Sequence, residues 1–300
     1  MVDEHIRWVP REPLRRHVAW YTGYRQRGVP PARHRGLPSP YLTLIFTLDE
    51  PLTIEAHPDP GQPPGDFGTL LGGLHSAPAL IAHCGAQSGI QVALRPLGAR
   101  ALLGLPAGEL ASLDVPAEAV LGGVCAELRD RVAFAAGWRE RFAILDEILL
   151  RLATVAAASG ALAQDVAPEV GWAWRQLLRS GGDLRVSELA AQTGWSGRHL
   201  ASRFRAEIGL TPKGAARVIR FDRARRRLTG QLAGPGYRPA DPGYRLADLA
   251  AGCGYFDQAH LAREFRALAG CPPSQWVAEE FRNVQAGNWL AEPGWDDQAR

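Results

Sequence analysis

The hydrophobic positions of the chain follow two different periods, with the change near residue 118. Up to about residue 115, short runs of β-branched and aromatic residues lie between Gly- and Pro-rich segments, which is typical of strands and turns. Strands are expected at Tyr41–Leu48, Leu52–Ala56, Thr69–Leu71, Ala79–His83 and Ile90–Leu94. The second of these suits a partner strand for the first. The proline-rich stretch His57–Asp66 predicts a loop, and Gly98–Leu105 predicts a short helix.

From Glu118 onward the apolar residues recur at helical spacing. Phe142, Leu145, Ile148, Leu149, Leu152 and Val155 form one stripe, which predicts a long amphipathic helix over Trp138–Ala158. A shorter helix is expected over Ala117–Val132. Ala156–Pro168 has the small residues of a linker, and Trp172–Arg179 begins a last domain with an almost wholly helical pattern. The pattern therefore divides the chain into two predicted domains, residues 1–165 and residues 172–285.

The last domain contains an internal repeat. Arg185–Trp195 matches Arg245–Tyr255, and after a length difference of one residue His199–Arg205 matches His260–Arg266. The match continues through Gly209 with Gly270 and Pro212 with Pro273. Each copy is therefore a helix, a glycine-containing turn and a second helix.

The repeated residue types fit a helix-turn-helix unit. Leu189 and Leu249 supply core contacts on the first helix, and a glycine (Gly194, Gly254) can end that helix with positive φ. The second helices carry the buried i,i+4 pairs Leu200/Phe204 and Leu261/Phe265. The alternative is a helical repeat or αα-hairpin without a role in DNA binding.

The solvent face of each second helix favours DNA binding. Arg, Gln and small residues on one face suit a helix in the major groove, where Arg pairs with guanine and Gln with adenine. The expected base-contacting residues are Arg198, Ser202, Gln258, Ala259 and Arg263. Expected phosphate contacts are Arg205, Lys213, Arg225, His260 and Arg266.

A basic amphipathic helix, Pro212–Leu228, joins the two units. Val218, Phe221 and Leu228 would face the units, which leaves several arginines for phosphate or for a merely solvated face. Charge follows the same division, because residues 181–290 hold 16 basic and 10 acidic side chains while the whole chain is only +3. A basic half joined to a slightly acidic half indicates a polyanion-binding module with an attached second domain.

Residues 172–283 resemble the DNA-binding domain of AraC/XylS-type regulators. The most specific stretches are Gly252–Arg266 and Gly270–Trp276, and Arg223–Leu228 resembles the end of the family's linker helix. The resemblance implies two recognition helices in successive major grooves of double-stranded promoter DNA. It also implies a transcription regulator that can contact RNA polymerase. Whether it activates or represses does not follow.

This chain departs from the family pattern in its first unit. Ala201-Ser202 stands where the family often has Ser-Arg, and Arg203 occupies a usually apolar position. The connection Thr229–Gly243 is unusually long. The second unit is therefore expected to contribute more to specificity than the first.

The first 160 residues resemble, more loosely, the β-rich sensor domain of actinobacterial regulators. The likeness lies in Gly72–Ser76 and Gly89–Ala99. It implies effector sensing or dimerisation, with His75 and Arg95 as candidate effector-pocket residues. Structural hydrogen bonding explains these two residues equally well. The expected fold is α+β, with a half-barrel or cupin-like β-rich domain followed by two helix-turn-helix units on a long helix.

Rival functions find less support. The chain lacks HExxH, GxSxG, P-loop and GxGxxG motifs, so no catalytic residue is expected. Its scattered histidines and four cysteines lack metal-ligand spacing, so neither a metal nor another cofactor is expected; the histidines considered are His17, His34, His57, His75 and His83. A binding protein that has lost DNA recognition stays open as an alternative.

No apolar run is long enough to span a bilayer, and the first ten residues have no signal-peptide core. A cytoplasmic protein with reduced thiols and no membrane partner is therefore expected. The long helix at 138–158 packs within the N-terminal domain or supplies a homodimer surface. The effector, the operator and the regulated genes do not follow from the sequence.

Overall fold

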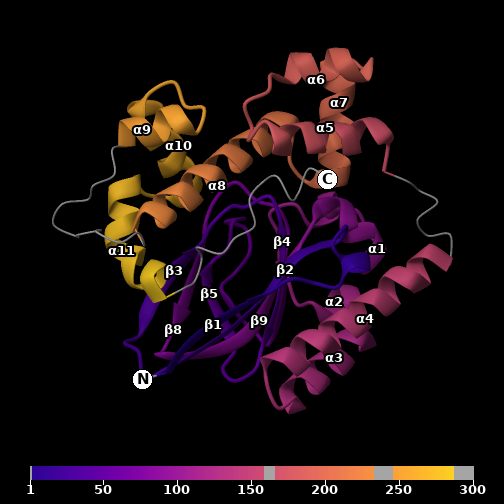
Figure 1. Ribbon diagram of the computed structural model, residues 1–300, viewed down its shortest axis with the longest axis vertical. Coiled ribbons are helices and arrows are strands. Elements are labelled where there is room, and N and C mark those ends of the chain that lie inside the picture. Colours follow the sequence, from indigo (N-terminus) through magenta and orange to yellow (C-terminus); the bar gives the residue numbers. More distant parts are fainter. Residues whose placement is uncertain (1, 159–165, 233–245, 287–300) are drawn as a thin grey trace.

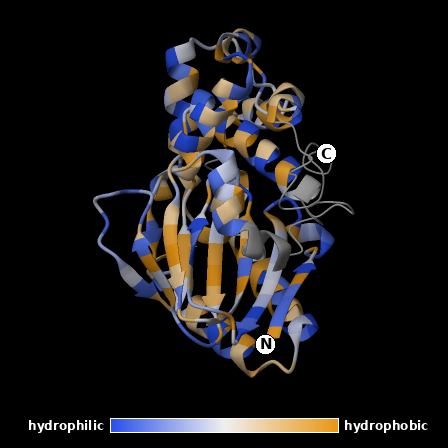
Figure 2. Ribbon diagram, turned by 90° about the vertical axis from the view of Figure 1, so that its left-hand side faces the viewer, coloured by the Kyte–Doolittle hydropathy of each residue, from blue (hydrophilic) through white to orange (hydrophobic). Residues whose placement is uncertain are grey.

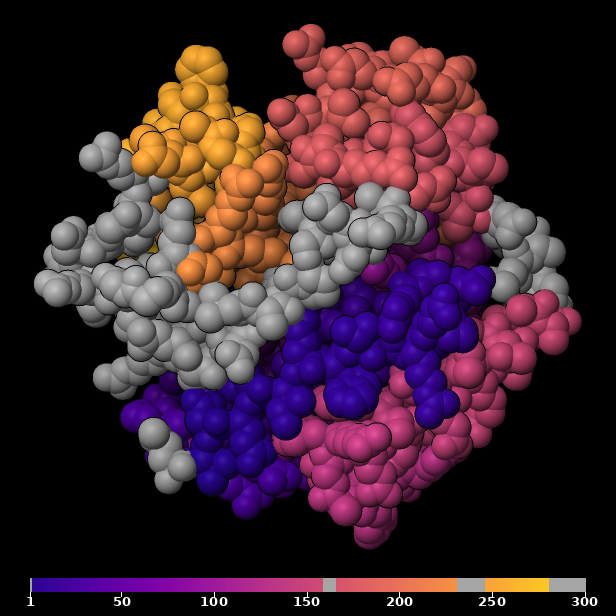
Figure 3. Space-filling model, in the orientation of Figure 1, coloured from indigo at the N-terminus to yellow at the C-terminus, as the bar shows by residue number. Residues whose placement is uncertain are grey.

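The computed structural model describes residues 2–158, 166–232 and 246–286 (Figure 1). A β-rich N-terminal half carries a helical C-terminal half along one side, as the space-filling view shows (Figure 3). The predicted α+β class is confirmed. The domain limits at 165 and 172 stay a proposal, because residues 159–165 lie outside the described part and helix α5 already begins at Pro168.

The N-terminal half contains two antiparallel sheets. The larger sheet has the order β1-β2-β9-β4-β7-β10, with strands Val2–Trp8, Val18–Arg27, Ala86–Leu94, Leu42–Thr47, Thr69–Gly72 and Asp114–Val115. The smaller sheet has the order β3-β8-β5-β6, with strands Ala32–Gly36, Ala79–His83, Leu52–Ala56 and Gly65–Phe67. These two sheets stand where the sequence predicted a half-barrel.

Alternation along the strands places apolar side chains on both faces of the larger sheet. Leu42, Leu44 and Phe46 of β4 are fully buried in the main core, whereas Ile45 belongs to a second cluster with Leu52, Ile54 and Leu70. In Figure 2 the central strands below the helical domain are mostly hydrophobic, other strands are mixed or hydrophilic, and the helices alternate between hydrophobic and hydrophilic residues. The larger sheet is thus the central layer of the N-terminal half.

Short helical segments and one long helix complete this half. They are η1 (Glu12–Leu14), η2 (Pro96–Gly98), α1 (Ala99–Leu103), η3 (Ala107–Leu110), α2 (Glu118–Leu121), α3 (Gly123–Phe134) and α4 (Trp138–Ala158). Helix α4 has the predicted bounds and buries Phe142, Leu145, Ile148 and Leu149. The single helix predicted over Ala117–Val132 is wrong, because the chain breaks at Gly122, which has φ 56°.

In its described residues the C-terminal half consists of helices joined by turns and contains no strand. It contains α5 (Pro168–Arg179), α6 (Val186–Thr193), α7 (Gly197–Ile208), α8 (Pro212–Leu232), α9 (Leu246–Gly252), α10 (Gln258–Ala269) and α11 (Pro273–Ala286). Helix α8 runs between the α6–α7 unit and the α9–α10 unit, which project from the same side of the molecule (Figure 1).

Several predicted elements differ from the structure. Leu52–Ala56 does form a strand, β5, but it pairs with β6 and β8 rather than with the Tyr41–Leu48 strand. Strands β1, β2 and β3 were not predicted, because their polar residues interrupt the apolar runs. Thr229–Leu232 continues α8 instead of starting the connection predicted over Thr229–Gly243, whose residues 233–245 lie outside the described part.

Candidate DNA-binding surface

The first unit is built by a glycine turn between α6 and α7. Gly194 ends α6 with φ 71°, and the Trp195 amide donates to the Ala190 carbonyl over 3.2 Å. Ser196 then caps α7, since its hydroxyl accepts a hydrogen bond from the His199 amide over 3.2 Å. Leu200 and Phe204 are fully buried.

The second unit repeats this local chemistry. Gly254 has φ 78°, and the Tyr255 amide donates to the Ala250 carbonyl over 3.0 Å. The Asp257 carboxylate caps α10 by accepting from the His260 amide over 2.6 Å. Leu261 and Phe265 are fully buried, as predicted from the repeat.

The candidate base-contacting side chains lie on the exposed faces of α7 and α10. Arg198 and Ser202 are exposed on α7, and Gln258, Ala259 and Arg263 are exposed on α10. Each set begins at the N-terminal end of its helix, where free amides favour a nearby phosphate. Arg198 and Ser202 are four residues apart, about one turn, and Arg263 lies four residues after Ala259 and five after Gln258. Their donors can bond base edges if the helix enters the major groove.

The five candidate phosphate contacts are not equivalent. Arg205, Lys213 and Arg266 are exposed. Arg225 instead donates to the fully buried Asp222 carboxylate over 2.7 Å and has a side chain only 12% exposed. His260 is half-buried, its ring lies against Tyr255, and its Nδ1 accepts from the Phe256 amide. The solvent-facing three have the geometry that a phosphate contact requires.

Most arginines of α8 have structural partners within the protein. Arg217 and Arg220 both donate to Glu264 of α10, over 2.9 Å and 3.3 Å. Arg225 and Arg226 bind Asp222, and Arg227 donates to the Gly252 carbonyl. The sequence offered phosphate binding or a solvated face for these residues. The structure shows a third role, in which α8 holds the second unit.

Three arginine contacts connect the helical domain to the β-rich domain. Arg100 donates three hydrogen bonds to the Glu207 carboxylate at the end of α7, the shortest of them 2.7 Å, and this carboxylate raises the pKa of Arg100. Arg35 of β3 binds Glu279 and Glu280 of α11 over 2.6 Å and 3.2 Å. The β-rich domain is therefore linked to the first unit and to α11, the helix that follows the second unit.

The third contact comes from the middle of the molecule. The Arg226 guanidinium lies 5.5 Å from the Trp20 ring centroid and 5.9 Å from that of Tyr41. Sequence reasoning missed all three contacts. For the Arg100 contact a signal was available in the sequence: Glu207 places a carboxylate at a buried helix position, immediately before the buried Ile208.

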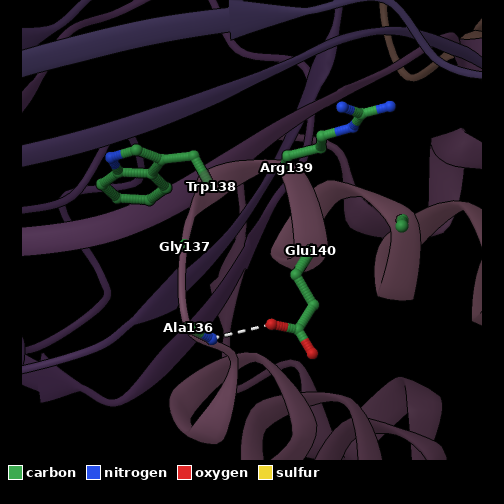
Figure 4. Close-up of a pocket in the computed structure, with 6 residues that line it drawn as sticks. Ala136, Gly137, Trp138, Arg139 and Glu140 are labelled. Carbon is green, nitrogen blue, oxygen red and sulfur yellow. Dashed lines mark hydrogen bonds between the residues drawn. The ribbon is translucent and has the colours of Figure 1, made fainter.

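The candidate effector residues make local contacts. The His75 Nδ1 meets the Ala77 carbonyl, and Arg95 Nε donates to the Arg15 carbonyl over 2.8 Å. A surface depression of about 590 Å³ lies elsewhere, at the start of α4, and is lined by Ala136, Gly137, Trp138, Arg139, Glu140 and Ala143. Its Glu140 carboxylate accepts from the Ala136 amide over 2.8 Å (Figure 4).

The histidine and cysteine side chains in the described part of the chain contact other groups of the protein rather than forming a metal site. His57 is buried and its Nδ1 lies 2.8 Å from the Asp114 carboxylate. The four cysteines form no disulfide in the structure, and burial raises the pKa of the Cys253 thiol beside the second unit's turn. In the described ranges, no group of three His, Cys, Asp or Glu side chains is placed to hold a metal ion. None of the helices described there is long and apolar enough to cross a membrane.

Residues 189–279 match the family model described as "Helix-turn-helix domain". That span runs from α6 to α11 and contains both glycine turns and both capped second helices. The C-terminal domain is an AraC-type helix-turn-helix domain. AraC-type domains bind DNA and regulate transcription, which agrees with the exposed basic faces of α7 and α10.

The β-rich domain preceding the AraC-type domain has its own match. Residues 6–116 match a model described as "Domain of unknown function (DUF6597)". That span covers most of both sheets and ends at the residue after β10. The comparison with curated proteins gives no match.

Among solved structures, the chain is similar to ToxT from Vibrio cholerae. An apo ToxT variant gives a TM-score of 0.49 at 9% identity, covering 86% of this chain and 96% of that one. A ToxT structure with a bound unsaturated fatty acid gives 0.48 at 9% identity, covering 86% and 94%. A further ToxT structure gives 0.47 at 10% identity, covering 86% and 96%. Similarity at this level assigns no residue of this chain a role.

Proposed function

We propose that the protein is a sequence-specific transcription regulator that recognises double-stranded promoter DNA with α7 and α10. The observation that carries this proposal is the pair of capped helices whose exposed faces present Arg198 and Ser202, and Gln258, Ala259 and Arg263. Both faces start at the helix N-terminus, and both helices are anchored through a fully buried Leu/Phe pair. Base contacts from these side chains would supply specificity.

Backbone contacts would come from Arg205, Lys213 and Arg266. Each is an exposed cation on or beside a recognition helix. We give Arg225 and His260 less weight as phosphate ligands, because Asp222 and the Tyr255–Phe256 turn already engage them.

The N-terminal domain is proposed to control DNA binding in response to a small molecule or a partner protein. The support is the set of interdomain contacts through Arg35, Arg100 and Arg226, because a ligand that shifts the β-rich domain would move both units relative to each other. His75 and Arg95 remain candidates for effector binding. A contact with RNA polymerase is an expectation of the family alone.

Electrophoretic mobility shift with promoter fragments tests the proposal. We expect binding that survives excess competitor DNA and weakens as salt rises, because phosphate contacts release counterions. The Gln258→Ala variant should lose preference among sequences. Arg139→Ala, which removes an exposed side chain at the start of α4, is the control for a change outside the recognition helices. Binding that is absent, or equal for all sequences, would favour a binding protein without DNA recognition.

A further inference from the structure

Strand β1 has an exposed outer edge. It is the first strand of the six-stranded sheet and pairs with β2 along its whole length, from Val2 opposite Arg27 to Trp8 opposite Tyr21. Among the described residues, no strand pairs with its other edge. Such an edge presents free backbone donors and acceptors.

Apolar side chains are exposed along this edge. Val2, Ile6 and Trp8 lie on one face of β1 and are 39%, 37% and 37% exposed, and Val9 directly after the strand is 52% exposed. These are four of the seven large hydrophobic residues exposed in the described part of the chain. A gathering of this kind on a sheet edge is typical of an interaction surface.

The charges of β1 are complementary to the same strand run in the opposite direction. In an antiparallel pair about a two-fold axis through His5, Asp3 would face Arg7 of the second copy, and Arg7 would face its Asp3. Within its own chain Asp3 accepts a hydrogen bond from Gln26 Nε2 over 3.0 Å, and the Arg7 guanidinium lies 4.0 Å from the Trp20 ring centroid, so the contacts across the pair would add to these. On the other face, Val2 lies opposite Trp8. Opposite charges and apolar pairs directly across a sheet each stabilise pairing. An isologous interface requires such self-complementarity.

Neighbouring registers lack this property. A two-fold pair must shift by two residues to keep each side chain on its face of the sheet. One shift places Glu4 opposite Glu4, and the other places His5 opposite Arg7. Only the pairing centred on His5 joins opposite charges at both ends and keeps all seven residues of β1 paired.

We propose that β1 is a homodimerisation edge, at which two copies of this chain join their six-stranded sheets antiparallel about His5. The occupant is a second copy because the pattern of charges and apolar residues matches itself. Exposed Trp8 and Val9 would be covered at each end of the pair. The dimer does not depend on DNA recognition, so either proposal can fail without the other.

Charge reversal tests the interface in the full chain by sedimentation equilibrium. Asp3→Arg and Arg7→Asp should each weaken self-association by roughly tenfold or more, since each places like charges opposite one another twice. A mixture of the two variants should associate again, because one strand then carries two arginines and the other two aspartates, so that opposite charges meet at both ends. Glu50→Arg, an equal charge change at an exposed site outside β1, should have no effect. Thermal unfolding of each variant checks that its fold is retained.

A cross-link tests the register. With the exposed Cys84 replaced by Ser, His5→Cys should form an intermolecular disulfide on mild oxidation, because the two side chains meet at the axis. Glu4→Cys, which faces Ile6 of the second copy, should cross-link far less. A monomeric protein overturns the proposal. So does a dimer indifferent to both reversals, which would place the interface elsewhere, for example on α4.

Discussion

The two helix-turn-helix units share their turn chemistry but differ in what holds the second helix. Each unit has one buried glutamate on that helix, at positions that do not correspond. Glu264 of α10 aligns with the exposed Arg203 of α7, and Glu207 of α7 aligns with the buried Leu268 of α10. Glu264 binds arginines of α8, whereas Glu207 binds Arg100 of the β-rich domain. Each carboxylate faces the surface on which its own helix packs.

This difference indicates that the two units are coupled differently to the β-rich domain. The end of α7 lies so close to the β-rich domain that a Cβ on Gly108 would stand 2.0 Å from the Ala206 carbonyl oxygen. Helix α10 has no arginine bond to that domain among the described residues. The second unit reaches it through α11 and, less closely than at Gly108, through Gly270 at the end of α10, where a Cβ would stand 3.5 Å from Pro78. A movement of the β-rich domain would therefore act first on the first unit.

Removing the matched core phenylalanines should have the largest effect. Phe265 packs against Phe221 and Trp276, with ring centroids 4.9 Å and 5.8 Å away, whereas Phe204 has Trp174 at 6.1 Å. Each change to alanine should lower the free energy of unfolding by about 3–5 kcal/mol, measured by chemical denaturation. Phe265→Ala should abolish specific DNA binding, and Phe204→Ala should leave part of it. Equal loss in both variants would contradict the proposed inequality of the units.

The base-contacting arginines compare the units directly. Arg263→Ala should weaken binding to the specific site by about 1–3 kcal/mol and relax one base position, if Arg263 forms a bidentate contact with guanine. Arg198→Ala should cost less, because the first unit presents fewer donors beside it. Titrations with specific and scrambled DNA measure both changes. An unchanged sequence preference in Arg263→Ala would remove its assigned role.

Much of this comparison was accessible from the sequence, and the rest was not for physical reasons. The repeat located both glycine turns and both Leu/Phe pairs, because local spacing determines them. The roles of Arg217, Arg220 and Arg226 could not be predicted, since their partners are decided by how distant elements pack. Strands such as β1 escaped prediction because polar residues interrupt their apolar positions, as Glu4 does between Val2 and Ile6. The contribution of Arg35 and Arg100 depends on domain contacts that no local pattern records.

The interdomain ion pair at the first unit should have a smaller effect than the core. Arg100→Ala leaves the Glu207 carboxylate, 9% exposed, without its charged partner and should destabilise the docked state by about 1–2 kcal/mol. Hydrogen exchange should then rise at the end of α7 and at η3, with α10 unchanged. Arg33→Ala, at an exposed pair on β3, is the matched control. Equally faster exchange in both units would show that the first unit is not coupled to the β-rich domain more strongly than the second.

The smallest expected effect is a weakening, in mild acid, of the contacts that α7 and α11 make with the β-rich domain. Burial lowers the pKa of His17, beside Gly98 of η2, from its usual value near 6.5 to about 4, and burial with the nearby His83 does the same for His34, next to Arg35. A lowered histidine pKa means that the unfolded chain takes up protons first, so stability is complete above pH 6.5 and falls as the pH drops toward 4. The effect is modest because both imidazoles are only partly shielded from solvent.

Unfolding measured between pH 7 and 5, above the range of ordinary carboxylates, should show this slope in the wild type. His17→Asn and His34→Asn should each flatten it, and hydrogen exchange should assign the change to α7 in the first variant and to α11 in the second. An unchanged slope in both variants would assign the acid sensitivity to other groups.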